Sequence, residues 1–115
     1  MEREKKKMQK MTLGLCAGRH EMPVSGFIFE NQLVPTDLAF LGEVCQEKLQ
    51  YCSSLTLYVT GLSVALVSVI NFCCKHQFPL ELMHYDPVKD EYYPQEVLTM
   101  VDYDLLVEDG RRYKK

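Results

Sequence analysis

The chain has 115 residues, 47% of them hydrophobic, which is enough apolar side chain for one core. Nine of its thirteen cations lie in residues 1–10 and 111–115, so residues 11–110 carry four cations against fourteen acids, a net charge of −10. An acidic body argues against a broad nucleic-acid footprint, the apolar runs are too short to span a membrane, and the charged amino end lacks a signal-peptide pattern. We therefore predict a soluble cytoplasmic protein with no membrane partner, organised as a basic tail (1–11), one domain (12–110) and a second basic tail (111–115).

The five cysteines show no spacing typical of a disulfide framework or of a zinc site. Most of them lie inside apolar runs, where free cysteine is commonly buried. We expect reduced structural thiols, no metal and no cofactor, and Cys52, near a predicted helix end, is the thiol to test for reactivity.

The first third of the chain predicts a strand, a polar loop and a helix. Residues 12–16 are short, apolar and compatible with a β-strand, and a polar loop follows them. Residues 27–29 form either a short strand or an apolar lid over the sheet. Thr36 or Asp37 can cap a helix whose apolar stripe indicates that it covers a sheet face.

Residues 55–86 predict a strand–helix–strand unit around which the domain is built. An apolar run ends at Thr60, and residues 62–74 then repeat apolar side chains at the helical period. Pro79 lies just past the helix end, and residues 80–86 form the next strand. Two strands joined by a buried helix are most simply parallel, with a right-handed crossover.

The close spacing of the next segment predicts a hairpin. Residues 86–91 are a polar turn and residues 92–97 an antiparallel strand, which Pro94 places at an edge of the sheet. The predicted fold class is α/β: a small Rossmann-like three-layer sandwich, β-α-β-α-β-β, with a mostly parallel sheet and an antiparallel edge strand.

Ligands of such sheets bind where the loops leave the carboxyl ends of the strands, so these loops hold the candidate site residues. Gly61 lets the backbone approach a ligand closely, and the free N–H groups of the following helix favour an anion. Thr60 and Ser63 can add hydrogen bonds to that anion. The alternative is a tight turn in which Thr60 or Ser63 caps the helix.

Two further loops carry candidate side chains. Arg19 can hold a phosphate or a carboxylate with two hydrogen bonds, or it can form a surface ion pair with Glu21. His20 and His84 are the candidate catalytic residues, because an imidazole can act as a general acid or base, although histidines at strand ends are also ordinary hydrogen-bonded residues. Tyr85 and Asp86, which follow the third strand, are candidate ligand-binding residues; the tyrosines around this hairpin can stack on a base or pack the sheet edge.

With these loops placed, the chain resembles the small CRISPR-associated Rossmann-fold proteins that sense or degrade cyclic oligoadenylates, stand-alone ring nucleases among them. The likeness covers residues 13–23 and 55–86. It implies that Arg19, Gly61 and Ser63 bind phosphates and that His20 assists catalysis. The chain also resembles short proteins of phages and mobile elements, some of which inhibit host defence.

Two functions follow as hypotheses. The first is binding of a nucleotide or other small anionic ligand at the carboxyl edge of the sheet, as a cyclic-oligonucleotide sensor or ring nuclease, with a homodimer as one arrangement that brings two Arg19 side chains together. The second is a non-enzymatic anti-defence (anti-CRISPR) inhibitor that binds a protein partner through its acidic surface. Whether the chain is an enzyme stays open at this point.

Overall fold

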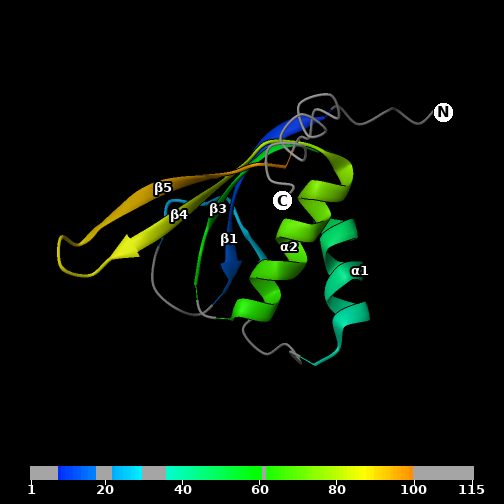
Figure 1. The fold of residues 1–115 in the computed structure, drawn as a ribbon, viewed down its shortest axis with the longest axis horizontal. Coiled ribbons are helices and arrows are strands. Elements are labelled where there is room, and N and C mark those ends of the chain that lie inside the picture. Colours follow the sequence, from blue (N-terminus) through cyan, green and yellow to red (C-terminus); the bar gives the residue numbers. More distant parts are fainter. Residues whose placement is uncertain (1–7, 18–21, 30–35, 61, 100–115) are drawn as a thin grey trace, which may run out of the picture.

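The computed structural model describes residues 8–17, 22–29, 36–60 and 62–99. These residues form five strands and two helices (Figure 1). In chain order the elements are β1 (Gln9–Cys16), β2 (Phe27–Phe29), α1 (Leu38–Leu49), β3 (Cys52–Tyr58), α2 (Ser63–His76), β4 (Leu80–Asp86) and β5 (Glu91–Val97).

The strands form one mixed sheet in the order β2-β1-β3-β4-β5. Strands β2, β1, β3 and β4 pair in parallel, and β5 pairs antiparallel with β4 at the sheet edge. The predicted α/β class, the mostly parallel sheet and the antiparallel edge strand are confirmed. Residues 27–29 are a strand, so the lid alternative is wrong, and β1 begins at Gln9, three residues before the predicted start.

Both helices lie on the same face of the sheet, where they pack against each other (Figure 1). The chain moves from β1 to β3 and from β3 to β4 in one direction across the sheet, and right-handed crossovers in one direction place their helices on one face. In the described residues the arrangement therefore has two layers, a sheet and a helix layer. The predicted three-layer sandwich is wrong, because no described helix covers the other face of the sheet. The sequence pattern predicts the crossover connections but not the order of the strands. That order decides whether the helices share one face of the sheet or lie on opposite faces.

The core lies between the helices and the sheet. Leu55 and Leu57 of β3 are buried and alternate with half-buried polar residues, as the two-residue period of a strand requires. The helices supply the buried residues that cover them: Leu41, Cys45 and Leu49 from α1 and Ala65, Val69, Phe72 and Cys73 from α2. The predicted burial of α2 is thus confirmed for one side of the helix, while Val67 on another side is 52% exposed.

The β4–β5 hairpin has a turn whose chemistry explains its shape. The Asp86 carboxylate accepts hydrogen bonds from the Val88 and Lys89 N–H groups, over 2.9 and 3.4 Å. Asp90 adopts a positive φ of 54°, which Asp tolerates better than most residues. Pro94 lies in the outer strand, where its missing N–H interrupts no second ladder.

None of the helices in the described part of the chain combines the length and the apolar character needed to cross a lipid bilayer. The tail predicted at residues 111–115 lies outside the described residues, as do most residues of the tail predicted at 1–11.

Candidate functional site

The described candidate residues fall into two groups in space: Thr60 and Ser63 follow β3, and His84, Tyr85 and Asp86 lie on the β4–β5 hairpin. Arg19, His20 and Gly61 lie outside the described residues. Their described neighbours, which show how the edge is built, are Ala17, Thr60 and Leu62.

Thr60 joins the carboxyl ends of two neighbouring strands. Its hydroxyl donates a hydrogen bond to the Cys16 carbonyl oxygen and accepts one from the Cys16 N–H, both over 3.3 Å. The side chain is buried, and no side-chain oxygen of Thr60 caps α2. The hydroxyl therefore serves the chain's own backbone, holding the end of β1 beside the start of the segment that leads into α2.

The amino end of α2 has no side-chain cap. Leu62 is the N-cap residue and offers no capping oxygen, and Ser63 is the first helical residue and is exposed. No acid lies in the first turn. By contrast, the Asp37 carboxylate caps α1 and accepts a hydrogen bond from the Phe40 N–H over 3.0 Å. The first N–H groups of α2, at the positive end of a 14-residue helix, thus lack the side-chain acceptor that those of α1 have.

His84, Tyr85 and Asp86 lie on the hairpin and bond within it. The parallel pairing of β3 with β4 ends at Tyr58 and Met83, so these three residues pair only with β5 in the described ladder. His84 Nε2 lies 2.7 Å from Gln95 Oε1, and the Tyr85 hydroxyl donates to Asp90 Oδ1 over 2.5 Å. That hydrogen bond to Asp90 raises the pKa of the Tyr85 phenol.

The structure does not bring the hairpin residues to the end of α2. The hairpin extends away from the body of the molecule and from the amino end of α2 where Ser63 lies (Figure 1). The sequence predicts that the three loops converge, because loops that leave the carboxyl ends of parallel strands meet at one edge of the sheet. Strand β4 instead continues beyond β3, because pairing with β5 supports it there.

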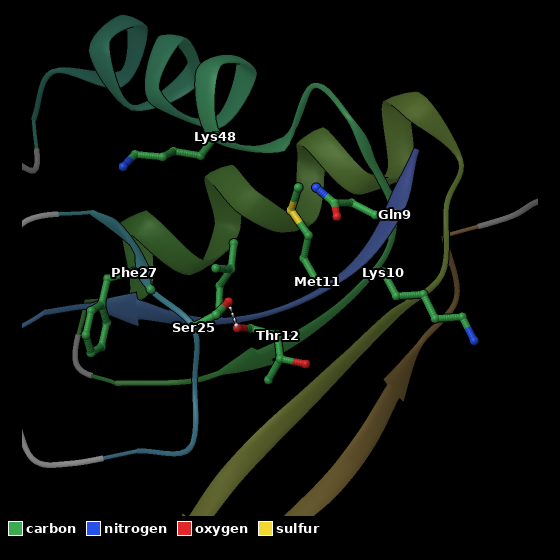
Figure 2. Close-up of a pocket in the computed structure, with 9 residues that line it drawn as sticks. Gln9, Lys10, Met11, Thr12, Ser25, Phe27 and Lys48 are labelled. Atoms are coloured by element: carbon green, nitrogen blue, oxygen red, sulfur yellow. Dashed lines mark hydrogen bonds between the residues drawn. The ribbon is translucent and has the colours of Figure 1, made fainter. Parts of the chain in front are cut away.

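A groove that the sequence did not indicate lies along the amino half of β1. It has a cavity volume of about 530 Å³ and lies beneath the carboxyl-terminal end of α1 (Figure 2). We call it the β1-edge groove; its lining residues are Gln9, Lys10, Met11, Thr12, Leu13, Ser25, Gly26, Phe27 and Lys48. Two of these are lysines and none is an acid, whereas the described residues as a whole carry eight acids and four lysines.

The sequence could not have shown the β1-edge groove. It exists because β2 is only three residues long and pairs with β1 at Gly14 and Cys16 alone. Lys10 and Lys48 are 38 positions apart in the chain, so their common location follows from the packing of α1 over the sheet edge. The local sequence feature that belongs to the groove is Lys48, a lysine in the last turn of the amphipathic helix α1.

None of the five cysteines forms a disulfide, and four of them are buried. Burial raises the pKa of Cys45 to about 11 and that of Cys73 to about 12. Burial also raises the pKa of Cys52, although a hydrogen bond with the Ser54 backbone partly opposes this effect by favouring the thiolate. Cys52 is therefore a poor candidate for a reactive thiol, and Cys74 is the exposed one. Among the described residues no three His, Cys, Asp or Glu side chains gather as a metal site would require.

Comparison with known proteins finds no matching family model, no matching curated protein and no matching solved structure.

Proposed function

We propose that this protein binds a small anionic ligand of the nucleotide class at the carboxyl edge of its sheet, between the end of β1 and the amino end of α2. The observation that carries the proposal is the α2 amino end, whose first turn has neither a side-chain cap nor an acid. Main-chain N–H groups at the start of a long helix favour negative charge, and phosphates are common occupants of such positions.

The neighbouring strand end supports the same location. Strands β1 and β3 are adjacent, and the Thr60 hydroxyl bonds to Cys16 at the carboxyl end of β1. Arg19 follows Ala17 by two positions in the sequence, and the proposal assigns its guanidinium to the negative charge of the ligand. Gly61 and Ser63 complete the binding residues of the proposal, with Ser63 exposed beside the helix start.

The resemblance to ring nucleases extends the proposal to cyclic oligoadenylates as ligands and to His20 as an acid or base in phosphodiester cleavage. His84, Tyr85 and Asp86 are not part of this site, because they belong to the hairpin.

Isothermal titration calorimetry with cyclic oligoadenylates and with mononucleotides tests the proposal. We expect Ser63→Asp to weaken binding by tenfold or more, since its carboxylate would occupy the positive end of α2, while the helix itself is stabilised. Arg19→Ala should weaken binding similarly, and Lys89→Ala, in the turn of the hairpin, is the matched control that leaves binding unchanged. Absence of heat with every nucleotide, or equal binding by the Ser63→Asp variant and the wild type, would refute the proposal.

A second candidate function rests on the charge of the hairpin. Five of the eight described acids lie in residues 80–97, with Lys89 as the only cation of that segment. Tyr85 and Tyr93 are exposed there, and tyrosine is favoured in protein interfaces. An acidic arm with exposed tyrosines suits a basic surface, such as the nucleic-acid channel of a nuclease, which is how an anti-defence inhibitor would act.

Retention of host proteins on the immobilised chain at low and high salt tests this second function. We expect a basic partner that is retained at low salt, is released at high salt and is lost with the double variant Glu91→Lys and Tyr93→Ala. A chain that retains nothing at either salt concentration would rule out the inhibitor function.

A further inference from the structure

The amino half of β1 has an edge that no described strand covers. Strand β3 pairs with β1 on one side from Gln9 to Gly14, whereas β2 pairs with the other side only at Gly14 and Cys16. Before Gly14, the described backbone contact on that side is the Ser25 N–H, which donates to the Thr12 carbonyl over 3.1 Å. Within the described residues, the amino half of β1 thus borders the β1-edge groove instead of a neighbouring strand.

The direction of the main-chain groups at this edge follows from the described hydrogen bonds. The Gly14 N–H donates to the Gly26 carbonyl over 2.9 Å, which shows that the main-chain groups of Gly14 point towards β2. Alternate residues of a parallel strand direct these groups to the same side. Lys10 therefore presents its N–H and carbonyl to the β1-edge groove, and Thr12 presents its N–H, as an edge strand does before it is extended. The Thr12 carbonyl already accepts hydrogen bonds from the Ser25 N–H and the Ser25 hydroxyl, both over 3.1 Å.

The two lysines of the groove lie on opposite sides of this edge. The Lys48 side chain starts at the last turn of α1 above the groove, and the Lys10 side chain points away from the helices on the other side of β1 (Figure 2). A compact anion could not contact both ammonium groups at once. A strand lying along β1 could, because its successive side chains alternate between the two faces of the sheet.

We propose that the β1-edge groove binds an extended acidic peptide segment of a partner protein, which adds to the sheet as a strand beside β1. Main-chain hydrogen bonds to the N–H and carbonyl of Lys10 and to the Thr12 N–H would supply affinity, as in other strand-addition complexes. Acidic side chains on both faces of the added strand would supply specificity through Lys48 and Lys10. Pairing of this edge with the same edge of a second copy is disfavoured, since it would place these lysines against each other.

Fluorescence anisotropy with the full chain and a labelled synthetic peptide tests this proposal. The probe is a hexapeptide with two adjacent aspartates flanked by valine and threonine, so that one carboxylate lies on each face of an added strand. We expect the Lys48→Glu variant to bind the peptide about fivefold or more weakly than the wild type does. Added salt should weaken peptide binding more steeply for the wild type than for this variant. The matched control is Lys75→Glu, an exposed lysine in the last turn of α2 outside the groove, which should change binding less than twofold.

Backbone pairing is tested with two N-methylated versions of the same peptide, one methylated at the odd and one at the even positions. Only one set of N–H groups faces β1, so one version should lose binding and the other should keep it. Three results would overturn the proposal. They are equal binding of both methylated peptides, an equal loss of binding in the Lys48→Glu and Lys75→Glu variants, or no binding of the parent peptide. The outcome is separable from that of nucleotide binding, because Lys48→Glu leaves the end of α2 unchanged.

Discussion

At the residue scale, Thr60 shows how one side chain can decide the geometry of a strand end. Its hydroxyl both donates to and accepts from the backbone of Cys16, 44 positions earlier in the chain. Valine has the same shape as threonine but cannot form either bond. Thr60→Val should therefore lower the free energy of unfolding by about 1–3 kcal/mol, measured by urea denaturation. Thr60→Ser keeps the hydroxyl and is the control; a Thr60→Val variant as stable as the wild type would contradict this account.

Substitution by alanine should have opposite effects on stability at Gly14 and at Gly42. A Cβ atom at Gly14 would lie 2.5 Å from the Phe27 ring, so Gly14→Ala forces that ring to move and should destabilise the fold by about 1–3 kcal/mol. Gly42 lies within α1, exposed, and a Cβ there meets nothing within 4 Å. Gly42→Ala should stabilise the fold by about 0.5–1 kcal/mol, because alanine is the better helix former.

Thermal or urea unfolding of the two alanine variants measures both glycine effects in one experiment. The argument fails if Gly14→Ala is neutral, or if Gly42→Ala is as destabilising as Gly14→Ala.

At the element scale, the hairpin contains like charges directly opposite each other. Glu81 pairs with Glu96 across β4 and β5, and both side chains are exposed. Opposed like charges on one sheet face are destabilising. A double-mutant cycle with Glu81→Gln and Glu96→Gln should show an unfavourable coupling of about 0.2–0.5 kcal/mol that shrinks in 1 M salt. A coupling of zero at low salt would show that the two carboxylates do not interact.

The two helix starts show which local features can be predicted. Asp37 was predicted as a candidate cap of α1, and its carboxylate accepts the Phe40 N–H as expected. Thr60 or Ser63 was the expected alternative cap of α2, yet neither residue is its N-cap. The difference is that an N-cap side chain normally bonds within its own helix, whereas the Thr60 hydroxyl found a partner on another strand.

At the scale of the whole molecule, buried thiols couple stability to alkaline pH. Burial holds the pKa of Cys45 near 11 and that of Cys73 near 12, above the ordinary value of 9.0. Because these folded-state pKa values are raised, the unfolded chain loses these protons first. Stability is therefore unchanged by these groups below pH 9 and falls as the pH rises from 9 towards 12, by up to about 1.4 kcal/mol per pH unit for each thiol.

Urea unfolding between pH 8 and pH 11 measures this loss of stability. The double variant Cys45→Ala and Cys73→Ala should be less stable at pH 8, because it leaves cavities, but its stability should fall less steeply with pH. An unchanged slope in the double variant would assign the alkaline loss to other groups.

The sequence by itself determined most of the element types, because strand and helix periods, Pro79, Pro94 and the Asp37 cap are local signals, although it left residues 27–29 as a strand or a lid. It also determined the parallel strand–helix–strand unit and the antiparallel edge. Only the tertiary structure decided three further features. The strand order places both helices on one face, and the longer β4 places His84 far from Ser63. The short β2 leaves the β1-edge groove between Lys10 and Lys48. Each of these depends on which strand lies beside which and how far it extends, and such contacts are made between residues that are distant in the chain.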